Sequence, residues 1–153
     1  MIKIVEGNIL NATEDIICQQ VNCIGVIGAG LAKQIITKYP EVYKSYKQFC
    51  KGVKDGDNRN LLGTIQTIQT NDGKVISNLF SQYGYGRDQP YTNYMALKYC
   101  LESILKIAIK FNNSIAIPYN IGCGLGGGDW TIIYKIIDEV FINYEVTIYR
   151  FEK

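Results

Sequence analysis

Two glycine-rich segments carry the clearest chemical signal in the sequence. Residues 25–30 and 122–128 each follow an apolar run with strand character and precede a helical pattern. Backbone N–H groups in such a loop, together with the positive end of the following helix, bind anions. Two loops of this kind in one short chain therefore predict a ligand with phosphate at its middle. The alternative is a pair of tight turns, although the run Gly126-Gly127-Gly128 has more glycine than a turn needs.

The sequence contains no histidine, and this absence restricts the chemistry that the chain can perform. It excludes Ser-His-Asp and Cys-His catalysis, histidine-ligated zinc and an imidazole general base. The cysteines are odd in number and form no Cys-x-x-Cys pair, so neither zinc nor a disulfide framework is predicted, and no cofactor is expected. Free thiols in a reducing compartment are the simpler interpretation of Cys18, Cys23, Cys50, Cys100 and Cys123.

Two nucleotide-binding fingerprints are also excluded. Gly122, Gly124 and Gly127 satisfy G-x-G-x-x-G after a strand, and Glu145 lies at the distance of a ribose-binding acid. That fingerprint opens its domain, whereas only 26 residues follow Gly127, too few for the rest of a Rossmann sheet. No G-x-x-x-x-G-K-[ST] run occurs, which excludes a P-loop.

Length and composition predict a single domain over residues 1–153. The chain is 47% hydrophobic and has no apolar run of membrane-spanning length and no secretory signal, so a cytoplasmic protein without membrane association is expected. We expect a monomer. The net charge of +2 is small and the lysines are scattered along the chain, which does not predict a nucleic-acid surface.

Apolar periodicity predicts an alternation of strands and helices with one hairpin inserted at residues 70–73. This order predicts a mixed, mostly parallel sheet with helices on both faces. Ligands of such sheets bind beyond the carboxyl ends of the strands, where both glycine loops would lie. The predicted strands are 1–5, 15–21, 61–69, 74–80, 114–118 and 145–151, and the predicted helices run from the first loop to about 39 and over 40–51, 92–111 and 130–141.

Four motifs in this order resemble those of a macrodomain. They are Gly7-Asn8-Ile9-Leu10, then Val21-Asn22 before Gly28-Ala29-Gly30-Leu31-Ala32, then Asn78-Leu79-Phe80-Ser81-Gln82, and last Pro118-Tyr119-Asn120-Ile121-Gly122-Cys123-Gly124-Leu125. Within that superfamily the chain is most similar to the branch of ADP-ribose-1''-phosphate phosphatases and ADP-ribosyl-glutamate hydrolases. The resemblance implies a three-layer α/β/α fold with a six-stranded mixed sheet and a pocket for ADP-ribose.

The resemblance also implies how the ligand would be held. Asn8 would accept the adenine amino hydrogens with the Ile9 backbone beside it, Phe151 would pack on adenine, and Asn22 would lie at the distal ribose. A turn or cap role for Asn8 and Asn22, and a core role for Phe151, are the structural alternatives. The implied ligand-binding set is Gly7, Asn8, Ile9, Asn22, Gly28, Ala29, Gly30, Leu31, Arg87, Asn120, Ile121, Gly122, Cys123, Gly124, Leu125, Gly126 and Phe151, with Cys123 contributing its backbone and Arg87 facing either a terminal phosphate or solvent.

The chain departs from the family at the catalytic positions. The glutamate-hydrolysing relatives use a Lys and an Asp, and these positions fall on Gln82 and Gly126 here, so that mechanism is not expected. The remaining catalytic candidates are Asn22, Gln82 and Asp129, of which Asp129 would orient water or cap the last helix.

The expected function is binding of ADP-ribose with slow hydrolysis of a group on its distal ribose, most simply ADP-ribose-1''-phosphate. Catalysis would rest on a positioned water and on backbone stabilisation of charge. The alternatives are a reader that binds ADP-ribose without chemistry and a hydrolase of ADP-ribosylated protein or nucleic acid. Nucleic acid is expected as a partner only in that last form.

Overall fold

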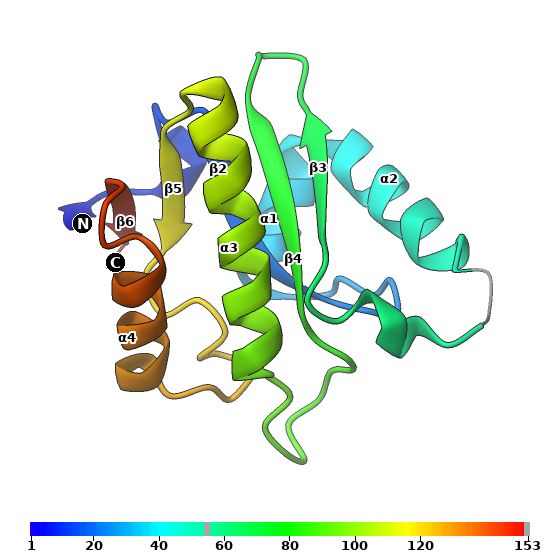
Figure 1. The fold of residues 1–153 in the computed structure, drawn as a ribbon. Helices are drawn as coiled ribbons and strands as arrows, with labels where there is room; N and C mark the ends of the chain where they lie inside the picture. The colour runs from blue at the N-terminus through cyan, green and yellow to red at the C-terminus, as the bar shows by residue number, and fades with distance from the viewer. Residues whose placement is uncertain (54–55, 152–153) are drawn as a thin grey trace.

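Six strands form one mixed sheet at the centre of the molecule (Figure 1). The structure is a computed structural model and describes residues 1–53 and 56–151. Every neighbouring pair is parallel except β3 and β4, the predicted hairpin, so the mixed, mostly parallel sheet is confirmed. In spatial order the strands are β1 (Ile2–Glu6), β6 (Val146–Arg150), β5 (Ile115–Pro118), β2 (Ile16–Asn22), β4 (Val75–Gln82) and β3 (Ile65–Gln69).

Helices cover both faces of this sheet, which confirms the three-layer α/β/α arrangement. On one face α3 (Tyr94–Phe111) and α4 (Trp130–Val140) pack on the sheet through buried leucine and isoleucine side chains. On the other face lie α1 (Gly30–Lys38) and α2 (Pro40–Lys51), whose buried Ile35, Val42 and Tyr46 complete the core. Two 3-10 turns, η1 (Ile9–Asn11) and η2 (Asn58–Leu61), follow β1 and α2.

The central strand β2 is buried except at the partly buried Gln20, and it contains three side-chain amides. Ile16, Ile17 and Cys18 are buried in the core, as expected for a strand covered on both faces. Gln19 and Asn22 are also buried, with exposed fractions of 1% and 6%. Because a buried amide without partners is costly, these side chains need fixed hydrogen bonds, and those bonds shape the site described below.

The hairpin differs from the expectation at both ends. The predicted strand over 61–69 begins only at Ile65, because Leu61 ends η2 and Gly63 adopts a φ of +86° that a strand does not accommodate. The strand predicted to end at residue 80 continues to Gln82, which bridges to Thr92. The predicted surface loop 54–60 falls partly on residues 54 and 55, which lie outside the described residues; the remainder forms a turn and η2.

Among the described residues, no helix combines the length and the apolar character needed to cross a bilayer.

Candidate functional site

A cavity of about 460 Å³ lies at the carboxyl ends of β2 and β5, beside the first turn of α1. This is the edge of the sheet at which the glycine loops were expected to meet. The cavity brings together these residues of the sequence-predicted site: Asn22, Gly28, Ala29, Gly30, Leu31, Gln82, Asn120, Ile121, Gly122, Gly124, Leu125 and Gly126. It adds residues outside the predicted ligand-binding and catalytic sets, namely Gln19, Gln20, Val21, Val26, Ile27, Ala32, Tyr85, Pro118 and Tyr119.

The first glycine loop delivers the start of α1 to the cavity wall. Ala29, the residue that precedes α1, makes no side-chain cap hydrogen bond, and the first turn contains no acidic side chain. Ala29, Gly30, Leu31 and Ala32 all line the cavity. The first N–H groups of a helix have no partner within the helix, so here they and the positive end of the helix dipole are available to an anion in the cavity.

Asn22 holds that loop in shape. Its Oδ1 accepts hydrogen bonds from the N–H groups of Ile24 and Val26, both at 3.2 Å, and from the Tyr46 hydroxyl at 2.7 Å. Its Nδ2 donates to the Val26 carbonyl at 2.7 Å. The Asn22 side chain therefore caps the loop that follows it, as the structural alternative predicted. Only the second Nδ2 hydrogen is left for a ligand or a water.

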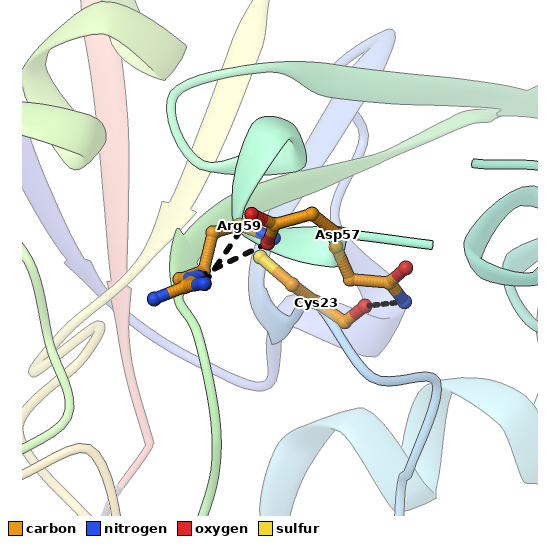
Figure 2. Close-up of polar contacts among 4 residues, drawn as sticks. Cys23, Asp57 and Arg59 are labelled. Carbon is orange, nitrogen blue, oxygen red and sulfur yellow. Dashed lines mark hydrogen bonds and ion pairs between the residues drawn. The ribbon is translucent and has the colours of Figure 1, made fainter. Parts of the chain in front are cut away.

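The 3-10 turn η2 supports the same loop from outside (Figure 2). Asn58 donates from Nδ2 to the Cys23 carbonyl at 2.8 Å, and Asp57 pairs with Arg59 at 3.0 Å on the solvent side. Cys23 in turn donates its backbone N–H to the Tyr83 carbonyl at 3.0 Å. Hydrogen bonds from η2 and to the segment after β4 thus fix the turn that follows Asn22.

A network of side-chain hydrogen bonds fixes the second glycine loop. Gln20 donates from Nε2 to Gln82 Oε1 at 2.7 Å and to Thr92 Oγ1 at 2.9 Å, and its Oε1 accepts from Ser81 at 2.6 Å. Thr92 donates to the Gly122 carbonyl at 2.7 Å. Gln82 completes the network by donating to the Gly84 carbonyl at 2.8 Å. Gln82 is therefore occupied by protein partners on both atoms of its amide, as a scaffold of the cavity wall.

Sequence reasoning assigned no role to Gln20, Ser81 or Thr92, although the sequence contains a signal for the first two. Adjacent polar residues occur within two largely buried strands, at Gln19-Gln20 and at Ser81-Gln82. Buried amides and hydroxyls are found with partners, so two such pairs indicate strands whose polar groups meet. Thr92 is not part of that pattern, because it lies in the loop before α3 and reaches the network by its hydrogen bond with Gln20.

Two cavity glycines have no conformational need to be glycine. A Cβ built on Gly28 or Gly124 meets no heavy atom within 4 Å, and neither residue has positive φ. Gly126 is different, since its Cβ would lie 2.5 Å from Thr92 Oγ1 and 2.7 Å from the Gly122 carbonyl oxygen. Tight turning and packing therefore account for Gly126, whereas Gly28 and Gly124 leave open space on the two loops of the cavity.

Several residues of the predicted site do not line the cavity. Asn8 caps η1, accepting the Leu10 N–H at 3.0 Å, and Phe151 is 60% exposed, so its interpretation as a core aromatic is wrong. Arg87 is exposed on the loop before α3. Burial raises the pKa of the Cys123 thiol, in agreement with a backbone role only. The residues outside the lining are Gly7, Asn8, Ile9, Arg87, Cys123, Asp129 and Phe151.

Asp129 is the N-cap of α4. Its side chain accepts the Thr131 N–H at 2.9 Å, and its own N–H donates to the Tyr94 hydroxyl. The cap alternative is thus what the structure contains, and Asp129 is not among the cavity-lining residues.

We predict that Asp129→Asn retains the free energy of unfolding, because Asn caps as well as Asp, and that Asp129→Ala loses about 1 kcal/mol. Urea denaturation of both variants measures this. If Asp129 also orients water, Asp129→Asn loses turnover at equal ligand saturation, by about 100-fold, the scale of general-base assistance; an unchanged rate restricts its role to the cap.

The cavity wall is uncharged. No Asp, Glu, Lys or Arg belongs to the described residues that line it, and its aromatic side chains are Tyr85 and Tyr119. The described residues also include no cluster of Cys, Asp and Glu able to hold a metal ion. An anion in this cavity would therefore be balanced by backbone N–H groups and a helix end, without a cation from a side chain.

The comparisons with known proteins agree with this geometry. The Macro domain family model matches residues 18–137. The chain belongs to the Macro domain family. The motif resemblance is confirmed, and with it the fold of this macrodomain.

Similar proteins of two kinds illustrate the relationship. The macrodomain is 30% identical to a DNA ADP-ribosyl glycohydrolase of Mycobacterium tuberculosis over 142 residues. The matched region covers 92% of this chain and 39% of that relative. Among solved structures it matches the macrodomain of Mycobacterium tuberculosis DarG (TM-score 0.80, 26% identity, 97% of both chains) and a Bacteroides thetaiotaomicron protein of unknown function (TM-score 0.86, 26% identity, 98% of both chains). The chain spans about two fifths of the length of the first curated relatives it matches.

Proposed function

We propose that this macrodomain binds the ADP-ribose unit in the cavity between its two glycine loops. The observation that carries the proposal is the combination of an uncapped start of α1 with bare glycines at positions 28 and 124. Backbone N–H groups bind a diphosphate only if it approaches closely, and a side chain at either glycine would prevent that approach. Membership of the Macro domain family supports the same ligand.

The side chains around the cavity suit an asymmetric ligand. Asn22 and Gln82 are paired neighbours on β2 and β4 and both line the cavity, and the distal ribose would lie beside them; Tyr119 and Asn120 line the wall formed after β5. Asn8, Ile9 and Phe151, which the family resemblance assigns to adenine, extend the proposed site beyond the lining itself. Adenine would then rest on the surface near Phe151, which is exposed and available for contact.

Isothermal titration calorimetry tests the proposal. We predict that ADP-ribose binds with a 1:1 ratio and that NAD binds more weakly, because in the proposed orientation a distal pocket between Asn22 and Gly122 would accommodate a ribose and leave little room for nicotinamide. Equal or tighter binding of NAD would contradict the proposed orientation, and no heat from ADP-ribose would contradict the proposal itself.

A second candidate function is hydrolysis of a bond to the distal ribose, supported by the relatives named DNA ADP-ribosyl glycohydrolases. Asn22 and Gln82 both line the cavity, but their amides are already engaged, which leaves a water oriented by the second Nδ2 hydrogen of Asn22 as the attacking group. Slow turnover follows, because the described cavity lining supplies no carboxylate or lysine to act as a base.

The charge of the cavity lining also bears on which group is released from the distal ribose. ADP-ribose-1''-phosphate brings a dianion, and the described lining contains no Lys or Arg to balance it. A neutral acceptor such as a nucleobase brings no such charge. The cavity therefore supports an ADP-ribosyl conjugate better than the phosphate ester as substrate.

Incubation of the protein with three substrates distinguishes these functions. ADP-ribosylated single-stranded DNA, ADP-ribosylated protein and ADP-ribose-1''-phosphate are each followed for release of ADP-ribose or phosphate. Binding of ADP-ribose without release from any of them supports a reader, and release from one of them identifies the hydrolase and its substrate.

A further inference from the structure

The outer face of α2 gathers lysines that are dispersed in the sequence. Lys44, Lys47 and Lys51 are exposed and follow one another at helical spacings of three and four residues. They line a groove of about 350 Å³ together with Pro40, Tyr43 and Gln48. Over the seven residues from Lys44 to Lys51 the helix rises about 10 Å, so the three charges form a short stripe on one face.

Among the described residues, no carboxylate forms an ion pair with the lysines of this stripe. Within the described residues the one ion pair joins Arg59 to Asp57, and none involves the α2 lysines. Residues 30–51 contain five lysines and a single acid, Glu41, whereas residues 129–145 contain four acids and one lysine. The net charge of +2 therefore hides a strong asymmetry, with a basic side formed by α1 and α2 and an acidic side around α4.

The first glycine loop, which lines the proposed ADP-ribose cavity, packs on the helix that carries the groove. A Cβ at Gly25 would lie 4.0 Å from Lys47 Cα and 3.4 Å from Cys50 Cβ, so the first glycine loop rests directly on α2. Three residues of the same loop, Val26, Ile27 and Gly28, line the cavity. A polymer whose modified unit occupies the cavity has a short path over this loop to the lysines.

The groove also contains one half-buried aromatic side chain, Tyr43. The Tyr43 ring is part of the groove wall, and Lys47 Nζ lies 5.1 Å from its centre. Positive charge interleaved with exposed aromatic rings is how proteins bind single-stranded nucleic acid, since phosphates meet the charges and unpaired bases stack on the rings. An acidic peptide would use the charges but not the ring. A stacked strand advances about 3.4 Å per phosphate, so 10 Å accommodates about three phosphates.

We propose that the α2 groove formed by Tyr43, Lys44, Lys47 and Lys51 binds single-stranded nucleic acid beside the cavity. The proposal rests on the proposed function in one respect: the strand reaches the groove because its ADP-ribosyl group occupies the cavity. Binding of an unmodified strand to the groove is independent of that step and is measured separately.

Fluorescence anisotropy with an unmodified, labelled single-stranded DNA oligonucleotide at low salt tests the proposal, in parallel with calorimetry for ADP-ribose. We predict that Lys44→Gln/Lys47→Gln/Lys51→Gln weakens oligonucleotide binding by about 10-fold or more and lowers the slope of log K against log salt by about 2. Tyr43→Leu weakens binding with the salt slope unchanged. Affinity for ADP-ribose stays at the wild-type value in both.

The matched control is Lys98→Gln/Lys106→Gln/Lys110→Gln, which removes three exposed lysines from α3 and changes the net charge equally. Equal losses in the two triple variants would overturn the proposal, because net charge alone would then explain binding. Absence of oligonucleotide binding, or equal competition by polyglutamate of the same charge, would also overturn it. If the wild-type protein binds the oligonucleotide but not ADP-ribose, the proposed function is refuted and the proposal for the α2 groove is retained.

Discussion

Gly124→Val is expected to weaken ADP-ribose binding by about 100-fold or more and to leave the free energy of unfolding near the wild-type value. A Cβ at Gly124 meets no heavy atom within 4 Å, and its φ is not positive, so the folded chain has space at the Cβ position and the backbone conformation suits a residue other than glycine. The residue is exposed and lines the cavity, so the added methyl groups occupy space that the diphosphate needs. A loss of 100-fold corresponds to about 2.7 kcal/mol of binding free energy.

Calorimetry for ADP-ribose and urea denaturation of the same samples measure the two halves of this expectation. Gly28→Val repeats the test on the first loop, where a Cβ also meets open space. Gly52→Val is the matched control, because this glycine lies outside the cavity, lacks positive φ and has ordinary contacts at 3.5 Å. A folded Gly124→Val protein with wild-type affinity would exclude the second loop from the site.

The architecture was accessible from the sequence because its elements are strongly periodic. The apolar repeat of α3 and α4 and the continuous apolar run of β5 leave little choice of secondary structure, and strand–helix alternation then predicts a mostly parallel sheet. The error at residues 61–64 has a local cause. Apolar Leu61 and Leu62 indicate a strand, but Gly63 with positive φ turns the chain, and both leucines pack under α2 instead.

The cavity lies where the sequence predicts the two glycine loops to meet, whereas the hydrogen-bond partners of its side chains were not predicted. Glycine loops identify backbone that a ligand approaches, and this follows from residue type alone. Whether an amide faces a ligand or the protein depends on partners far away in sequence. Asn22 is occupied by Tyr46 and Gln82 by Gln20, contacts across 24 and 62 residues, and neither partner belongs to a recognised motif.

The lysines of the α2 groove could have been predicted from the sequence, but the small net charge of the whole chain concealed their spacing on one helix face. Lys44, Lys47 and Lys51 lie on one face of any helix that spans them, and residues 40–51 were predicted to form that helix. Net charge over the whole chain cancels this stripe against the acids near α4. Charge counted by helix face would have indicated a basic surface from the sequence.

Gly126→Ala is expected to lower the free energy of unfolding by about 3 kcal/mol, near the upper end of the cost of overpacking. Its Cβ would lie 2.5 Å from Thr92 Oγ1, 2.7 Å from the Gly122 carbonyl oxygen and 2.8 Å from Gln20 Nε2. None of these atoms is free to move. Thr92 and the Gly128 N–H both donate to the Gly122 carbonyl, at 2.7 and 2.8 Å, and Gln20 donates to Thr92.

Because this network fixes the second loop, Gly126→Ala also weakens ADP-ribose binding, but only as a consequence of its effect on the fold. Gly124→Ala, two residues earlier, is the matched control: its added methyl group meets open space, so its free energy of unfolding stays at the wild-type value. Equilibrium urea denaturation of the two alanine variants gives the comparison directly. Equal stability of Gly126→Ala and Gly124→Ala would mean that the loop relaxes without loss, and that the Gln20–Thr92–Gly122 network does not hold the cavity wall in place.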